Sequence, residues 1–158
     1  MDNGLIKEIE DSFSCTKIPE SDKDICDLVD PGSEGIRAAF LGERWNELEL
    51  VTLLNLGGDA LTQLNDEAYV YYLPSYLLRL VQQIDECDSD ILELIVSEFS
   101  STVNYKYTIS RLTLFSKQQI SVVYKVLKSA KADFIKSDLD SAIKLLKKTV
   151  KKDSVLDT

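Results

Sequence analysis

Apolar residues recur every three or four positions in one segment after another of this 158-residue chain. In the first segment, Leu5, Ile9 and Phe13 share one face, and charged residues occupy the other. This spacing is typical of an amphipathic helix that packs against a core. The pattern predicts an all-α fold, a compact bundle of about seven helices that forms a single domain over residues 1–158.

Capping residues and helix breakers indicate where these helices begin and end. Ser21 is a predicted N-cap. Asp90 and Glu93 have the spacing of a capping box, and Ser116 repeats this pattern with Gln119. The expected helices span residues 3–13, 21–30, 33–41, 45–56, 90–99, 117–132 and 138–151.

The longest apolar stretch, residues 65–84, contains Pro74. A proline inside a helix removes one backbone hydrogen bond, and its ring clashes with the preceding turn. We therefore expect two helices here, 66–72 and 74–84, with Pro74 in the first turn of the second.

One segment departs from the helical period. Val103, Tyr105, Tyr107 and Ile109 alternate with polar residues, which is the period of a strand. A single short strand has no obvious pairing partner, so we expect an extended linker near residues 102–112, with a short hairpin as the alternative.

The charge of the chain is divided between its two parts. Residues 1–100 carry 22 acidic and 6 basic side chains, a formal charge of −16. Residues 101–158 carry 5 acidic and 12 basic side chains, a formal charge of +7, which leaves the whole chain at −9. Fields of this kind accelerate encounter with an oppositely charged partner and favour a binding role.

The chain contains no histidine, which removes much of the usual active-site chemistry. Nucleophilic pairs with histidine and histidine-bound metals are therefore excluded. The three cysteines are too few for an all-cysteine zinc site, and they indicate reduced thiols in a cytoplasm. We expect a cytoplasmic protein that is not an enzyme, with no catalytic residues, no cofactor and no metal.

Four acids crowd into residues 85–90, more than the capping of one helix requires. They imitate the start of an EF-hand loop, but Ile91 and Ser97 stand where that loop needs a glycine and a glutamate. We interpret them as the centre of a surface for a basic partner. In the tyrosine-rich segment 69–76, at least two of the four tyrosines are expected in the core, and the others can line a partner surface. The predicted partner-binding residues are Asp85, Glu86, Asp88, Asp90, Tyr72 and Tyr76.

The last predicted helix, 138–151, follows the predicted cap Ser137 and carries lysines opposite its apolar stripe. Such a helix can lie on an anionic membrane or on a nucleic acid. No aromatic residue or arginine accompanies these lysines after Phe134. We therefore expect neither a nucleic acid nor a membrane as partner, and favour a helix docked on the core with a solvated lysine face.

Three segments resemble an uncharacterised bacterial family of domains of unknown function. Residues 64–77, LNDEAYVYYLPSYL, match its signature E-A-[FY]-x-[YF]-Y-L-P-[AS]-[YF]-L. Residues 40–45, FLGERW, are similar to its upstream aromatic segment, and residues 114–119, LFSKQQ, to the start of its C-terminal helix. The resemblance covers most of residues 5–130 and implies no established activity.

Bacterial immunity proteins that neutralise nuclease toxins are typically small, acidic and cytoplasmic, without catalytic groups, and this chain is similar to them in kind. We therefore expect a monomeric immunity protein that binds a basic protein, such as a toxin domain, by electrostatic complementarity. An adaptor or regulatory subunit is the first alternative. An enzyme that works without histidine is the second.

Overall fold

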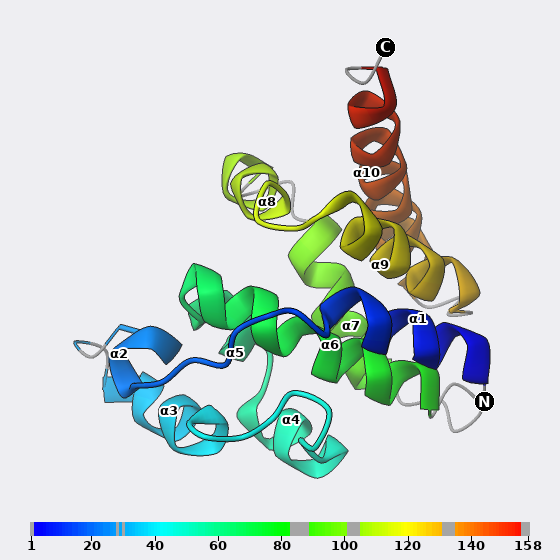
Figure 1. Cartoon of the computed structure of the whole chain (residues 1–158). Coiled ribbons are helices and arrows are strands. Elements are labelled where there is room, and N and C mark those ends of the chain that lie inside the picture. Colours follow the sequence, from blue (N-terminus) through cyan, green and yellow to red (C-terminus); the bar gives the residue numbers. More distant parts are fainter. Residues whose placement is uncertain are drawn as a thin grey trace.

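The computed structural model describes residues 2–27, 29, 31–82, 89–100, 105–130 and 135–155. These residues form helices joined by turns and loops, as Figure 1 shows. No strand occurs among them, and their isolated β-bridge joins Cys26 to Leu64. The expected all-α fold is confirmed.

The elements follow one another in a simple order. The chain first forms α1 (Asn3–Phe13), α2 (Asp22–Ile25), a 3₁₀ turn (Pro31–Ser33), α3 (Glu34–Phe40), α4 (Leu50–Leu56) and α5 (Ala60–Gln63). It continues with α6 (Asp66–Gln82), α7 (Ser89–Ser100), α8 (Tyr105–Leu112), α9 (Lys117–Ser129) and α10 (Lys136–Val155).

Helix α6 forms the centre of the core. Twelve of its 17 residues are buried, so that most of its circumference is covered. Helices α1, α7 and α9 pack around it, and α10 packs on α7 and α9. In Figure 1 the last turns of α10 project away from this body toward the C-terminus.

The proline does not divide α6, and the expected pair of helices at 66–72 and 74–84 is wrong. Pro74 lies inside one continuous helix, Asp66–Gln82. Proline lacks the N–H that would bond to the carbonyl of Val70, and a proline disfavours a helix interior by about 3 kcal/mol. The burial of α6 on most sides outweighs this cost, because tertiary packing overrides local propensity.

Residues 105–112 form α8, so the extended linker or hairpin expected near 102–112 is wrong where the structure describes it. The buried side chains of α8 are Thr108, Arg111 and Leu112, which recur at the spacing of a helix face. Two tyrosines that suggested a strand are more than a third exposed. The segment is too short for its alternation of polar and apolar residues to distinguish the two periods.

Several helices begin or end at other residues than expected. Helix α2 ends at Ile25 rather than at 30, and α10 begins at Lys136, before the predicted cap Ser137. Helix α4 begins at Leu50 rather than at 45. Before it, the carbonyl of Leu48 accepts a hydrogen bond from the Arg79 side chain of α6 at 2.7 Å, instead of one from the backbone of a helix.

The predicted capping residues have different outcomes. The capping box before α9 is confirmed, since the Gln119 N–H donates to Ser116 Oγ at 3.2 Å and the Ser116 N–H donates to Gln119 Oε1 at 2.9 Å. Ser21 precedes α2 as its N-cap, but its hydroxyl bonds to the Asp24 carboxylate instead of the backbone. Helix α7 begins at Ser89, so Asp90 lies in its first turn.

Candidate functional site

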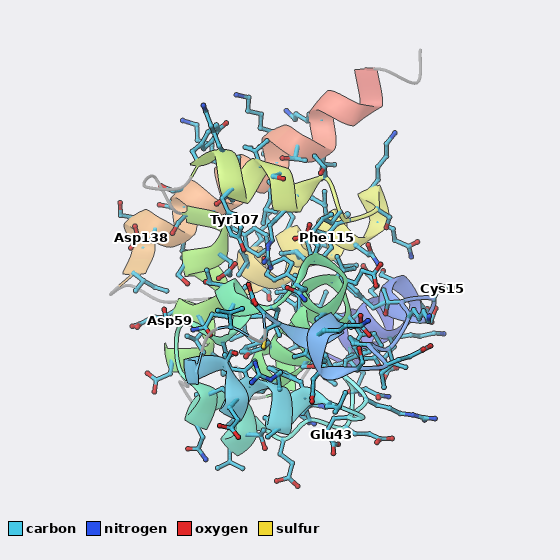
Figure 2. All side chains as sticks on the ribbon, turned by 90° about the vertical axis from the view of Figure 1, so that its left-hand side faces the viewer. Cys15, Glu43, Asp59, Tyr107, Phe115 and Asp138 are labelled. Atoms are coloured by element: carbon cyan, nitrogen blue, oxygen red, sulfur yellow. The ribbon has the colours of Figure 1, made fainter. Side chains whose placement is uncertain are left out.

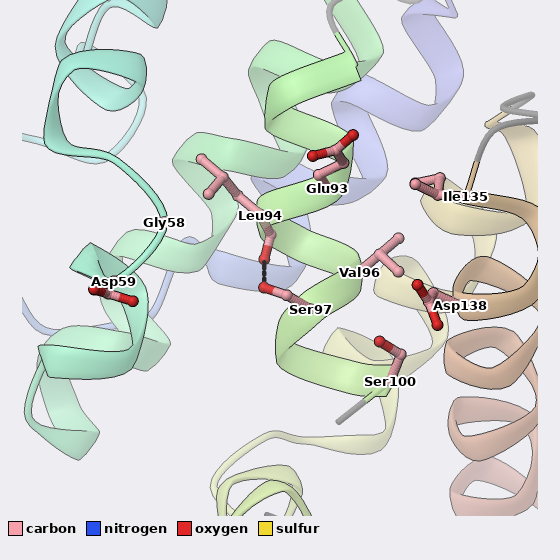
Figure 3. Close-up of a pocket in the computed structure, with 9 residues that line it drawn as sticks. All are labelled: Gly58, Asp59, Glu93, Leu94, Val96, Ser97, Ser100, Ile135 and Asp138. Carbon is pink, nitrogen blue, oxygen red and sulfur yellow. Dashed lines mark hydrogen bonds between the residues drawn. The ribbon is translucent and has the colours of Figure 1, made fainter. Parts of the chain in front are cut away.

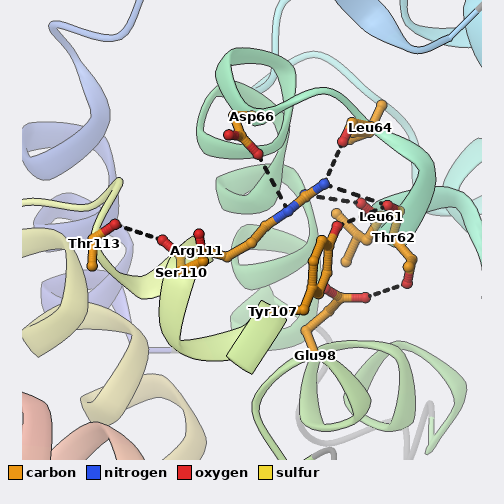
Figure 4. Close-up of polar contacts among 9 residues, drawn as sticks. All are labelled: Leu61, Thr62, Leu64, Asp66, Glu98, Tyr107, Ser110, Arg111 and Thr113. Atoms are coloured by element: carbon orange, nitrogen blue, oxygen red, sulfur yellow. Dashed lines mark hydrogen bonds and ion pairs between the residues drawn. The ribbon is translucent and has the colours of Figure 1, made fainter. Parts of the chain in front are cut away.

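The largest buried polar cluster surrounds Arg111 of α8, which is 7% exposed (Figure 4). Its guanidinium donates to the backbone carbonyls of Leu61, Thr62 and Leu64, at 3.4, 3.4 and 2.5 Å. These carbonyls lie at the C-terminal end of α5, where a helix leaves carbonyls without a partner of their own. Arg111 therefore caps α5 from a distant part of the chain.

The same guanidinium contacts two aromatic rings and one carboxylate. Its central carbon lies 4.2 Å from the centroid of the Tyr69 ring and 4.8 Å from that of the Tyr107 ring, within the range of cation–π attraction. Arg111 Nε lies 3.6 Å from Oδ1 of Asp66. Because Asp66 is 66% exposed, solvent screens this pair, and it contributes little to stability.

Glu98 of α7 brings a carboxyl group to the same cluster and is 9% exposed. Thr62 donates its hydroxyl to Oε1 of Glu98 at 2.7 Å. Burial raises the pKa of the Glu98 carboxyl, while the Thr62 hydroxyl and the Arg111 charge act in the opposite direction. Burial, together with the charge of Glu98, holds the pKa of Tyr69 well above its ordinary value.

This cluster contains groups that an enzyme without histidine would use, but it is arranged as a structural clamp. Its hydrogen bonds are made to backbone carbonyls and within the cluster. Glu98, Arg111 and Tyr69 line neither the groove along α7 nor the smaller cavities beside Lys17 and Lys23. The cluster joins α5, α6, α7 and α8, and we assign it no substrate.

An open groove of about 520 Å³ follows the outer face of α7 (Figure 3). Helix α7 lies in the middle of this region, with the start of α5 on one side and the start of α10 on the other. Leu94, Val96 and Ile135 give the groove apolar surface, and Ser97 and Ser100 add hydroxyl groups. A volume of this size is within the range of binding sites for small ligands and short segments of chain.

Three exposed carboxylates line this groove, and Figure 2 shows two of them, Asp59 and Asp138, on the same side of the molecule. Asp59 precedes α5, Glu93 belongs to α7, and Asp138 lies in the first turn of α10. Asp59 stands at the N-cap of α5 without capping it, so its carboxylate has no helical partner. No lysine or arginine lines the groove, and no ion pair joins the three carboxylates to a basic side chain within the described ranges. The α7 groove thus combines uncompensated negative charge with apolar surface.

The acids predicted at 85–90 adjoin this groove through Asp90. Asp90 is exposed and lies one turn before Glu93 on the same face of α7. Asp85, Glu86 and Asp88 lie outside the described residues. A binding role for these acids stays a prediction.

The two tyrosines predicted as partner contacts lie in the core. Tyr72 and Tyr76 are both 0% exposed, so neither side chain reaches a surface. Tyr72 donates its hydroxyl to the carbonyls of Phe40 and Glu43, at 2.5 and 3.2 Å, and its ring centroid lies 4.4 Å from that of Phe40. All four tyrosines of the 69–76 segment are buried, which confirms the core interpretation and corrects the alternative of a partner surface.

Sequence reasoning missed the carboxylates of the α7 groove as a set. Asp59, Glu93 and Asp138 come from three elements that are far apart along the chain, and no motif connects them. The available signal was limited to α7, where Asp90, Glu93 and Ser97 recur at helical spacing and indicate one polar face.

Two further properties concern membranes and metals. Within the described ranges, none of the helices combines the length and the apolar character that crossing a membrane requires. The same residues contain no group of three or more histidine, cysteine, aspartate or glutamate side chains arranged to hold a metal ion.

Comparison with known proteins gives one match. The model of a family of unknown function, DUF6714, matches residues 2–151. This range includes the segments that carry the resemblance to an uncharacterised family, and it extends into α10, which that resemblance did not reach. The comparisons with curated proteins and with solved structures give no match.

Proposed function

We propose that this chain, which belongs to the family of unknown function DUF6714, is a small acidic binding protein whose α7 groove receives a basic partner. One observation carries the proposal: Asp59, Glu93 and Asp138 line one groove, and no lysine or arginine is among its lining residues in the described part of the chain. Like charges at one site repel, and a partner that supplies lysine or arginine removes this repulsion. The apolar side chains beside the carboxylates give such a partner surface to bury.

More specifically, we propose that the protein is an immunity protein that neutralises a nuclease-type toxin in the cytoplasm of a bacterium. A nuclease is basic where it meets the phosphate backbone, and an acidic groove competes for that basic surface. The net charge of −9 and the lack of histidine support a binding protein over an enzyme. An adaptor that uses the same groove is the alternative.

The test is the triple variant Asp59→Asn, Glu93→Gln, Asp138→Asn. The unaltered chain and the variant are each used to capture proteins from the native host, and the captured proteins are identified by mass spectrometry. We expect the unaltered chain to retain a basic protein that the variant loses. Adding the unaltered chain to that purified protein should also abolish its nuclease activity.

A matched control separates the groove from the overall charge. The variant Glu10→Gln, Asp11→Asn, Glu43→Gln removes three exposed acids outside the groove and changes the net charge equally. This control should capture the partner as the unaltered chain does. Equal capture by all three proteins would refute the groove as the binding site, and a captured protein without nuclease activity would favour the adaptor.

A further inference from the structure

Helix α10 carries a second charged surface, of opposite sign and on another part of the molecule. We call it the lysine stripe and define it by three exposed residues: Lys144, Lys147 and Lys148. With 3.6 residues per turn, these positions fall within roughly 100° of the helix circumference and span about 6 Å along its axis. The opposite face of α10 is apolar and buried through Leu139, Ala142 and Leu146.

The lysine stripe is available to a partner. It lies in the middle of α10 (Lys136–Val155), whereas Asp138 of the α7 groove lies in the first turn of the helix. Lys144, Lys147 and Lys148 form no ion pair within the described ranges. Asp140, one turn before Lys144 on the same face, marks the acidic limit of the stripe.

The composition of the stripe disfavours two kinds of partner. A protein interface is centred on apolar and aromatic anchors, and the stripe offers none. A helix that inserts into a membrane does so with its apolar face, but α7 and α9 cover that face of α10, so that a membrane would be held by charge alone. The phosphate backbone of a nucleic acid requires neither feature, because ammonium groups bind phosphate oxygens as point charges.

We propose that the lysine stripe binds the phosphate backbone of a nucleic acid without reading its sequence. This departs from the expectation drawn from the sequence, which rested on the lack of arginine and aromatic residues beside the lysines. Those residues serve base recognition and base stacking, and contact with phosphate does not require them. The proposal concerns a different surface from the α7 groove and does not rest on the proposed function.

The net charge of −9 is compatible with this role. At physiological ionic strength, exposed charges are screened beyond about 8 Å, so a phosphate at the stripe responds mainly to the nearest side chains. Of the acids of the α7 groove, Asp59 precedes α5, Glu93 belongs to α7, and Asp138 lies in the first turn of α10, more than one turn before Lys144. The local field at the stripe is therefore positive.

The first experiment measures binding of the full chain to a fluorescently labelled 20-base-pair DNA duplex by anisotropy. Three phosphate contacts predict a slope of about −2.7 for the logarithm of the association constant against that of the salt concentration. A fourfold rise in salt, from 25 to 100 mM, should then weaken binding by about 40-fold. Two duplexes of unrelated sequence should bind equally, since no base is read.

The second experiment compares two variants with the same net charge. Lys144→Gln, Lys147→Gln, Lys148→Gln removes all three contacts, so this variant should no longer bind the duplex. The control Lys7→Gln, Lys23→Gln, Lys106→Gln removes three exposed lysines elsewhere and should keep the full slope. Replacing the three stripe lysines with arginine should preserve binding.

Several outcomes would overturn the proposal. They are no binding of the unaltered chain to the duplex at 25 mM salt, an equal loss of binding in both glutamine variants, and binding to vesicles of phosphatidylserine without binding to DNA. Circular dichroism of each variant shows whether α10 keeps its helix. Because the altered lysines are exposed, we expect unchanged spectra.

Discussion

Arg111 and Glu98 place ionisable groups in a core that is otherwise mostly apolar. Such groups are tolerated inside a protein when their hydrogen bonds are satisfied and their charges are balanced. Here the guanidinium bonds to three carbonyls at the end of α5, and the carboxyl group accepts from Thr62. Arg111 thereby ties α8 to the end of α5.

The first prediction is that Arg111→Lys lowers the free energy of unfolding by about 2–3 kcal/mol. Lysine keeps the charge, but its single ammonium cannot reproduce the fork that reaches carbonyls in different directions. Hydrogen bonds from charged groups contribute about 1.5–3 kcal/mol, and part of this is lost. Unfolding in urea, followed by circular dichroism, measures the effect, and a change below about 0.5 kcal/mol would contradict the clamp.

The second prediction concerns pH and Glu98. Burial raises the pKa of this carboxyl in the folded state, so the folded state prefers the protonated form. The corresponding stability is present below the unfolded pKa of about 4.3 and is lost as pH rises through the folded value. Glu98→Gln cannot titrate, so its stability should increase relative to that of the unaltered chain between pH 4 and pH 7. Urea unfolding of both proteins tests this, and a constant difference would show that Glu98 does not titrate abnormally.

Among the elements, α6 and α8 show where local sequence patterns succeed and where they fail. Most helices were predictable, because their apolar residues recur at helical spacing and residues such as Ser116 and Gly57 mark their ends. The continuity of α6 was not predictable, because the compensation for Pro74 comes from helices that pack around it. The helical state of α8 was not predictable either, since it depends on the contact of Arg111 with α5.

The third prediction is that Pro74→Ala raises the free energy of unfolding by roughly 0.5–1 kcal/mol. The restored N–H and the relief of the ring clash favour the helix by about 3 kcal/mol. The loss of two buried methylene groups offsets about 1.6 kcal/mol, and the greater freedom of the unfolded chain offsets about 0.4–1 kcal/mol more. Denaturant titration provides the measurement. A loss of more than 1 kcal/mol would indicate that the proline ring supports packing that alanine cannot replace.

The candidate site was less predictable than the fold. Sequence reasoning predicted an acidic surface at residues 85–90, and of these acids the structure describes Asp90, which is exposed in the first turn of α7. It could not bring Asp59 and Asp138 to the same groove, because their proximity depends on how α5 and α10 pack against α7. It also could not place Tyr72 and Tyr76, since a segment rich in tyrosine fits a core and a surface equally well until the neighbouring helices are known.

On the scale of the whole molecule, the division of charge along the chain becomes a division in space. The acids of the first 100 residues include those beside α2, α3 and α7, whereas α10 carries the lysine stripe in its middle. The two surfaces are of opposite sign, so a single value of net charge describes neither.

The fourth prediction follows from this separation and concerns chromatography. At pH 7 the net charge of −9 predicts retention on an anion exchanger and none on a cation exchanger. A resin, however, contacts one face of a protein at a time, and screening hides the far side beyond about 8–10 Å. The chain should therefore bind both kinds of resin at low salt. The variant Lys144→Gln, Lys147→Gln, Lys148→Gln should no longer be retained on the cation exchanger but should still be retained on the anion exchanger. A purification scheme chosen from the isoelectric point would miss this behaviour, because the lysine stripe lets a protein of negative net charge adsorb to a negatively charged resin as well.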